Sequence, residues 1–519
     1  MGFSILTLSY MKKIFTLIAA LMCVSALQAN TYTDKLIVTV NGSSSQQNAT
    51  ITVDEKDGLA TLSLKNFILE AGGSKMGIGN IELKDLKVEK AGDQSILATK
   101  QTITITNGDD ASIDTWMGPM LGAVPVELRA KYDANKLFAG IDIDMSATLQ
   151  QIIAVNFGDV YQIGNSGFEA FHNETCSGKT NPEPNNWHSF TSATGNAFLL
   201  AATAGMPSVS QSDKVRPGST GSSSVLIVSH SVLGKVANGT LTTGRLNAGS
   251  ATPDDYSNYS CLDMGSTALD GNGDPFYTAL DGQPDEISLW VKFKQTNASA
   301  QYPYATMSAV VTDGTEYKEP SKTEYKNVLM SANNSKITAC DWTKITVPFA
   351  YKDKNLTGKG IMVTLSTNAT PGKGGIDSLY VDDLELVYKA NLKAVKYGEL
   401  SADFSNATEA TIDLKGAATV QDVFDGMITE VEGNKALVGK TLNDDNTVTI
   451  KVYSQDLKTV NTYTLKLNGT ASVVDQVVKG EKTVAGIYTL NGVKVNEMSV
   501  NGIYVVKYTD GTAAKVIKK

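Results

Sequence analysis

Residues 286–293 read Glu-Ile-Ser-Leu-Trp-Val-Lys-Phe, and this stretch decides the fold of the middle of the chain. Side chains alternate between the two faces of a strand, so the apolar residues at odd-numbered positions share one face. Ser288, Trp290 and Lys292 share the other. The pattern predicts a strand with one face in a core and one face toward solvent or a loop, as in a β-sandwich.

Around this strand the block 159–390 carries further short apolar runs separated by long loops rich in Gly, Ser, Asn and Asp. We expect its other strands at Ser224–Ser229, Ala305–Val311, Ile345–Phe349, Ile361–Leu365 and Ser378–Tyr388. The longest loops lie at 207–224 and 252–284. Loops of this length on a β framework usually carry ligands or are merely mobile. The block therefore reads as a two-sheet sandwich.

The block 30–158 alternates apolar and polar residues with a period of two, and Asp57-Gly58 marks a turn between two strands. About eight short strands in such a length favour a closed barrel, because closure removes exposed sheet edges. The block 391–470 reads as a small β-sandwich with one short helix at 420–427. The last block, 478–519, repeats Gly-Ile-Tyr at 486–488 and 502–504 and predicts short hairpins. The whole chain is therefore expected to be all-β.

The N-terminal segment has the pattern of a signal peptide. Two lysines precede an apolar run at 14–27, which is too short to span a bilayer, and small residues follow it. We expect residues 1–29 to be removed, with Met11 as the true start, and the mature chain to be exported without a transmembrane segment. Lipid attachment at Cys23 is the alternative, although a bulky residue stands where lipidation signals carry a small one.

Composition restricts the function classes. With 42% hydrophobic and 19% charged residues the chain is mostly folded, and its 519 residues suffice for three or four domains. The formal charge of −9 argues against binding nucleic acid through a basic surface. The three cysteines after the leader, Cys176, Cys261 and Cys340, permit at most one internal disulfide and have no metal-site spacing.

Several phrases resemble known families. "GIGNIEL", "WMGPMLGAVPVEL" and "GIDIDM" in the first block resemble the calycin-like β-barrel domain of exported Bacteroidota proteins. In the second block "NSGFE", "EPNNWHSF", "DGQPDEISLWVKF", "WTKITVPFAY" and "GGIDSLYVDDLELVY" resemble the putative carbohydrate metabolism domain, PCMD, a galactose-binding-like jelly roll. The block 391–470 looks like a bacterial Ig-like module, and 478–519 is similar to a C-terminal sorting domain.

The jelly-roll resemblance implies a structural calcium ion. In the strand 379–388 the apolar alternation changes phase at Asp382-Asp383, which predicts a β-bulge that turns a carboxylate inward. In the carbohydrate-binding modules that this block resembles, an opening Glu and a closing Asp bind calcium, and they correspond here to Glu169 and Asp382. Hard oxygen ligands suit calcium. The alternative is that both carboxylates cap turns or face water.

Two other patterns do not meet the requirements of a metal site or a catalytic site. Residues 270–274 imitate the start of an EF-hand loop, but Pro275 stands where that loop needs Gly. His172, His188 and His230 lie in separate segments without ligand spacing, and no standard catalytic motif occurs.

Sugar recognition needs a flat aromatic ring with polar groups around it. Trp290 and Lys292 on the polar face of their strand meet this need, and the expected partners in neighbouring segments are Tyr277, Tyr302 and Tyr304. The alternative is that Trp290 is packed beneath a loop. We therefore expect an exported, non-catalytic protein that binds a polysaccharide or other glycan through its jelly roll.

Two other function classes stay open. A glycoside hydrolase would need a carboxylate pair, for which the acidic loop Asp281, Asp285 and Glu286 is the candidate. A structural or adhesin-type surface protein would have protein partners and no affinity for sugar.

Overall fold

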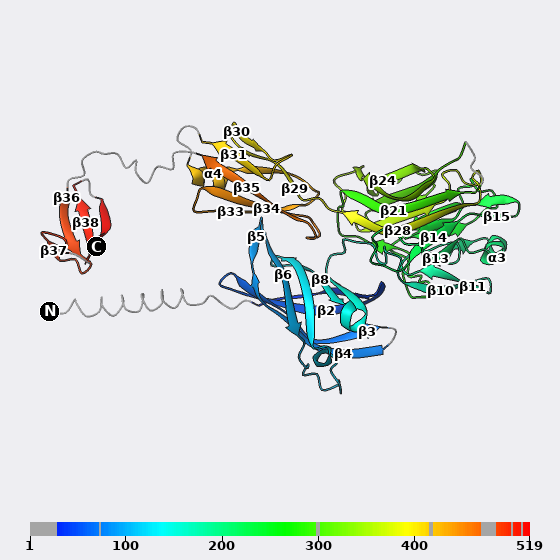
Figure 1. The fold of residues 1–519 in the computed structure, drawn as a ribbon, viewed down its shortest axis with the longest axis horizontal. Coiled ribbons are helices and arrows are strands. Elements are labelled where there is room, and N and C mark those ends of the chain that lie inside the picture. The colour runs from blue at the N-terminus through cyan, green and yellow to red at the C-terminus, as the bar shows by residue number, and fades with distance from the viewer. Residues whose placement is uncertain are drawn as a thin grey trace, which may run out of the picture. The chain divides into compact units, whose positions relative to one another are not determined.

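The computed structural model describes residues 29–71, 74–296, 301–414, 419–468, 484–499, 502–509 and 512–518. Strands dominate these residues and helices are few and short, so the chain is all-β as expected (Figure 1). None of the helices in these ranges is both long enough and apolar enough to span a membrane. The leader expected at residues 1–29 lies outside the described residues except for its last position.

A nine-stranded antiparallel sheet forms the N-terminal domain and curls on itself in Figure 1, in the order β4-β3-β2-β1-β9-β8-β7-β6-β5. Its elements are β1 (Asn30–Val40), β2 (Ser43–Lys56), β3 (Leu59–Ala71), β4 (Ser74–Lys87), β5 (Glu89–Ala91), β6 (Gln94–Thr104), η1 (Gly118–Leu121), β7 (Ala123–Tyr132), β8 (Leu137–Met145), α2 (Ser146–Leu149) and β9 (Gln151–Phe157). Its inward side chains, such as Leu36, Leu62 and Leu128, form one core.

The closed barrel expected from the sequence is not fully formed. Within the described residues the edge strands β4 and β5 share no ladder, and an isolated bridge between Asn80 and Thr106 joins β4 to the segment after β6. The pairing of β3 with β4 slips in register between Leu64 and Phe67, and bulges of this kind bend a strand and interrupt pairing. The domain is therefore a curled half-barrel.

The second block consists of two main sheets and smaller ones. One sheet has the order β13-β14-β28-β21-β25, the other has the order β17-β27-β22-β24-β26 with β20 beside β27, and a four-stranded sheet has the order β12-β18-β19-β23. The bounds are β10 (Phe171–Cys176), β11 (Lys179–Pro184), β12 (Thr194–Gly195), α3 (Ala197–Ala204), β13 (Val209–Ser212), β14 (Ser224–Val228), β15 (His230–Val232), β16 (Lys235–Ala237), β17 (Thr240–Thr242), β18 (Arg245–Ala248), β19 (Asn258–Leu262), β20 (Thr278–Ala279), β21 (Glu286–Gln295), β22 (Ala305–Thr312), β23 (Tyr317–Glu319), β24 (Val328–Ile337), β25 (Cys340–Pro348), β26 (Ala350–Tyr351), β27 (Gly360–Ser366) and β28 (Asp377–Val387).

The core of this sandwich lies on the face that the opening stretch predicts. The odd-numbered apolar residues of β21 are at most 1% exposed and belong to one cluster with Val363 and Leu365 of β27. The bulge predicted at Asp382-Asp383 is confirmed, because the pairing of β21 with β28 shifts between Ser288 and Trp290, and Asp383 has a φ of 43°. The three cysteines of this block are free thiols.

The C-terminal blocks are also built from short strands. Residues 391–468 contain β29 (Asn391–Tyr397), β30 (Leu400–Asp403), β31 (Glu409–Asp413), α4 (Val420–Gly426), β32 (Ile428–Glu432), β33 (Leu437–Leu442), β34 (Thr447–Tyr453) and β35 (Val460–Asn468). The expected helix is α4, which begins with a capping box between Thr419 and Asp422. The last sheet has the order β37-β36-β38-β39, with β36 (Val484–Thr489), β37 (Lys494–Val495), β38 (Gly502–Tyr508) and β39 (Ala513–Lys518).

Candidate functional site

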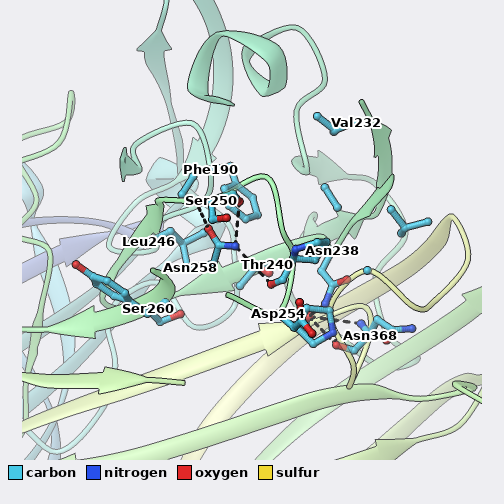
Figure 2. Close-up of a pocket in the computed structure, with 18 of the residues that line it drawn as sticks. Phe190, Val232, Asn238, Thr240, Leu246, Ser250, Asp254, Asn258, Ser260 and Asn368 are labelled. Carbon is cyan, nitrogen blue, oxygen red and sulfur yellow. Dashed lines mark hydrogen bonds between the residues drawn. The ribbon is translucent and has the colours of Figure 1, made fainter. Parts of the chain in front are cut away.

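A cavity of about 380 Å³ opens in the sandwich between β17, β18, β19 and β27 and the loops that join them (Figure 2). Rings and aliphatic side chains line one part of it, including Phe190, Tyr259 and Leu246. The charged residues Lys235, Asp254 and Glu319 also line it, and so do amide and hydroxyl side chains, namely Thr203, Asn238, Thr240, Asn247, Ser250, Asn258, Ser260, Thr306, Thr364, Ser366 and Asn368. The volume and the mixed lining are those of a small-ligand site.

Asn258 on β19 holds one wall of the cavity in place. Its Oδ1 accepts the Ser250 N–H at 3.0 Å, while its Nδ2 donates to the carbonyls of Ser250 at 3.0 Å and Thr252 at 2.9 Å. Figure 2 shows Asn258 bonded to Ser250. The Asn258 side chain therefore holds the loop that carries Pro253 and Asp254, together with the backbone bond from the Asn258 N–H to the Asp255 carbonyl at 2.9 Å, and these bonds pre-form the cavity.

Asn238 and Asn368 hold the opposite wall, as Figure 2 shows. The Nδ2 of Asn238 donates to the Asn368 carbonyl at 3.0 Å and to the Ser366 hydroxyl at 3.2 Å. The Oδ1 of Asn238 has no hydrogen-bond partner among the described residues. The cavity thus keeps one unused acceptor on a lining side chain.

Glu319 is the carboxylate that reaches the cavity from β23. The Ser308 hydroxyl donates to its Oε2 at 3.0 Å, and the Tyr317 hydroxyl donates to the same atom at 3.1 Å. Burial raises the pKa of Glu319 above its ordinary value, because desolvation outweighs these two bonds.

The residues predicted for sugar binding are divided between the two main sheets. Trp290 and Lys292 lie half-buried on the outer face of β21. The Arg216 guanidinium lies 5.5 Å from the centre of the Trp290 ring, and it pairs with Asp383. Lys292 Nζ donates to Asp341 at 2.6 Å. Arg216 and Lys292, which are both ion-paired, therefore lie on the same face as the Trp290 ring.

The three tyrosines lie in loops that lead into strands of the other sheet. Tyr277 directly precedes β20, and Tyr304 directly precedes β22. The carbonyls of Tyr302 and Tyr304 accept hydrogen bonds from Asn368 Nδ2 and from the Ala369 N–H, two residues that line the cavity. The structure does not join the five predicted side chains on one sheet, and their role in binding stays a prediction.

Glu169 and Asp382 lie close enough to interact electrostatically, at the bulge of β28. Burial and the negative charges of Asp383 and Glu169 raise the pKa of Asp382 to about 6. Its Oδ2 accepts the Arg216 N–H, while its Oδ1 has no partner among the described residues. Both the N–H and the hydroxyl of Ser222 donate to Glu169. Calcium between Glu169 and Asp382 stays a prediction.

The carboxylates of the acidic loop considered for hydrolysis form hydrogen bonds and an ion pair with neighbouring segments. Asp281 accepts the Val160 N–H, and Asp285 accepts the backbone N–H groups of Lys389 and Asn434. Glu286 pairs with Lys389 Nζ at 2.8 Å. These contacts give each carboxylate a structural role.

A second cluster of titratable side chains gathers around the β10–β11 hairpin. One ligand atom from each of His172, Glu174, Glu183 and Asp270 lies within 4.8 Å of the others, so these residues could hold a metal ion. His188 Nδ1 lies 3.6 Å from Asp270 Oδ2 and 4.0 Å from Glu183 Oε2. Desolvation raises the pKa of Glu183 to about 7 and lowers that of His188 to about 4.

This cluster brings together two histidines that lie in separate segments of the sequence and have no ligand spacing. His172 and His188 come together because the β10–β11 hairpin folds back and the loop after Leu269 closes over it. The EF-hand-like stretch does contribute, through Asp270 alone. The spacing of these residues in the sequence gives no signal for the cluster, since tertiary folding brings them together.

The comparisons with known proteins concern the two larger blocks. The family model of the calycin-like β-barrel domain matches residues 29–159, which agrees with the resemblance of the first block. No curated protein matches the chain.

Two solved structures have low similarity. One comes from work on the promiscuous specificity of carbohydrate-binding modules of the β-sandwich superfamily; it is 8% identical, covers 65% of this chain and 96% of that chain, and has a TM-score of 0.19. The other is the M60 catalytic domain with two CBM51 domains from Clostridium perfringens ZmpB; it is 8% identical, covers 95% of this chain and 44% of that chain, and has a TM-score of 0.15. TM-scores this low do not establish a common fold.

Proposed function

We propose that the chain is an exported, non-catalytic protein that binds a polysaccharide or other glycan in the cavity of its sandwich block. The observation that supports the proposal most strongly is the lining of that cavity. A sugar ring has an apolar face and a rim of hydroxyls, and the cavity offers rings such as Phe190 and Tyr259 beside many amide and hydroxyl groups. The other domains would then position this binding block.

Two further observations favour binding over catalysis. The three carboxylates of the acidic loop are held by backbone donors and by a lysine. In the cavity Glu319 is bonded by two hydroxyls, and the other carboxylate that lines it, Asp254, is exposed. A hydrolase needs one carboxyl held as an acid and a second group opposite it.

Binding is tested with a panel of soluble polysaccharides and the chain from residue 30, by affinity electrophoresis and then by calorimetry. Tyr259→Ala removes a ring from the cavity, and Trp290→Ala removes the ring on the outer face of β21. We expect Tyr259→Ala to weaken binding at least about tenfold, as for a central aromatic contact, and Trp290→Ala to change it little.

The outcomes separate the alternatives. Loss of glycan affinity in Trp290→Ala alone would indicate that the binding site lies on the outer face of β21. Absence of binding to every glycan would contradict the proposal and favour a structural or adhesin-type role, whereas release of sugar fragments would show a hydrolase. Export is tested separately by N-terminal sequencing of the mature protein, which should begin near residue 30.

A further inference from the structure

Four side chains near the cavity direct unpaired atoms toward one another. The atoms are His172 Nε2, Glu183 Oε2, His188 Nδ1 and Asp270 Oδ2, and none of them has a hydrogen-bond partner among the described residues. The side chains of Glu183, His188 and Asp270 are completely buried, and that of His172 is 9% exposed. Buried polar atoms are normally paired, so this convergence requires an explanation.

In His172 and His188, one ring nitrogen faces the cluster and the other forms a hydrogen bond outside it. That outer hydrogen bond determines which of the two nitrogens carries the proton. His172 Nδ1 lies 3.1 Å from Asn185 Oδ1, and His188 Nε2 lies 3.2 Å from the Pro275 carbonyl. Both partners are acceptors, so these nitrogens carry the protons and donate. The nitrogens that face the cluster then present lone pairs, which is the arrangement that second-shell acceptors impose on metal-binding histidines.

The two buried carboxylates are oriented in the same manner. Glu183 Oε1 accepts the N–H of Ser189 at 2.6 Å and its hydroxyl at 2.5 Å. Asp270 Oδ1 accepts the N–H groups of Asn272 at 2.9 Å and Asp274 at 2.8 Å. In each carboxylate one oxygen is held by the protein and the other points into the cluster. Four acceptors therefore converge, and beside them the Ser192 hydroxyl interacts with Glu183.

Of the three separations within this set, two match a metal ion better than a water molecule, and the third lies midway between the two cases. Ligands held tetrahedrally about 2.1 Å from a metal lie about 3.4 Å apart, whereas partners of a water at about 2.8 Å would lie about 4.6 Å apart. His172 Nε2 and His188 Nδ1 lie 3.5 and 3.6 Å from Asp270 Oδ2, and His188 Nδ1 lies 4.0 Å from Glu183 Oε2.

We propose that His172, Glu183, His188 and Asp270 bind one divalent first-row transition-metal ion, with zinc as the expected occupant. Two imidazoles and two carboxylates suit zinc, whereas calcium prefers oxygen ligands alone. Two carboxylates also balance the charge of a divalent ion in a buried site. Glu174, whose Oε2 lies 3.6 Å from His172 Nε2 and accepts the Gly271 N–H, stands at the more open side of the cluster.

The burial of the site indicates a structural role. The ion would join the β10–β11 hairpin and the segment directly after it to the loop at residues 270–274, which is far from both in sequence. His188 is two residues from Phe190, which lines the cavity. The metal would therefore stabilise one wall of the proposed glycan site, although the metal site itself does not depend on glycan binding.

The test uses the chain from residue 30, stripped with a chelator and then loaded with Zn²⁺, Co²⁺ or Ca²⁺. We expect one equivalent of zinc to remain after gel filtration, measured by elemental analysis. The unfolding midpoint should rise by about 5 to 10 °C when free zinc is one hundred times Kd. Co²⁺ should give the visible absorption of a four-coordinate site. Stabilisation by calcium but not by zinc would overturn the proposal.

Asp270→Asn and His188→Ala remove ligands, and His230→Ala is the matched control because His230 is the only other histidine of the chain. We expect both ligand variants to lose the retained zinc and His230→Ala to keep it. Equal retention in all variants would show adventitious surface binding and refute the site. If a ligand variant does not fold, the cobalt spectrum of the wild-type chain decides, since absence of that absorption also refutes it.

Discussion

Replacement of Asn258 by alanine should release one wall of the cavity. The side chain forms three hydrogen bonds of 2.9 to 3.0 Å with Ser250 and Thr252. At a net contribution of about 0.5 to 1.5 kcal/mol each, the three bonds amount to about 1.5 to 4.5 kcal/mol. Because Thr252 is exposed and water can replace its lost donor, we expect the lower end, about 2 kcal/mol.

The assay is hydrogen exchange of the Ser250 amide, whose acceptor in the native state is Asn258 Oδ1. A loss of about 2 kcal/mol in the free energy of local opening corresponds to about 30-fold faster exchange. Asn258→Asp keeps the acceptor and should show a smaller change. Glycan affinity should fall in the same order, because only the ordered loop completes the cavity.

Asn327→Ala is the matched control. Asn327 also fixes a loop through its Nδ2, which donates to the carbonyls of Thr315 and Glu316, but it does not line the cavity. It should leave the exchange of Ser250 unchanged. Unaltered exchange of Ser250 in Asn258→Ala would refute the claim that this amide holds the wall.

Three further predictions concern stability. Leu289→Ala, in the fully buried centre of β21, should lower the free energy of unfolding by about 2 to 5 kcal/mol in denaturant titrations, and a loss below about 1 kcal/mol would contradict the core assignment. Glu319 has a raised pKa in the folded state, so the folded chain binds more protons than the unfolded chain. The free energy of unfolding should therefore fall as the pH rises from about 4.5 through that pKa. In thermal scans, the unfolding midpoint of Glu319→Gln should depend less on pH than that of the wild-type chain. Thr419→Ala removes the capping box of α4 and should lower the free energy of unfolding by about 1 kcal/mol, measured by calorimetry. An unchanged unfolding transition would show that the cap does not stabilise the fold.

The sequence predicts the framework well because strand alternation is a local signal. The odd-numbered residues of β21 are buried as expected, and the phase change at Asp382-Asp383 marks a real bulge. The extent of barrel closure is not local. It depends on whether the edge strands β4 and β5 meet after the register slips in the β3–β4 pair, which alternation alone does not report.

The sites were harder to predict for the same reason. The cavity is lined by loops and strand ends from residues 190 to 372, and no motif joins them. The cluster of His172, His188 and Asp270 arises when a hairpin and a loop close together, so its residues have no regular spacing. The EF-hand-like stretch, which is rejected as a calcium loop because of Pro275, contains one residue of this cluster, Asp270.

The central claim is that the cavity binds glycan, and a hydrogen-exchange footprint of the bound complex tests it most directly. With a saturating oligosaccharide we expect protection to concentrate in residues 246–260 and 364–372, which line the cavity. Protection confined to residues 286–294 and 341–344 would place the ligand on the outer face of β21 instead. A tightly bound glycan that protected neither region would contradict the account.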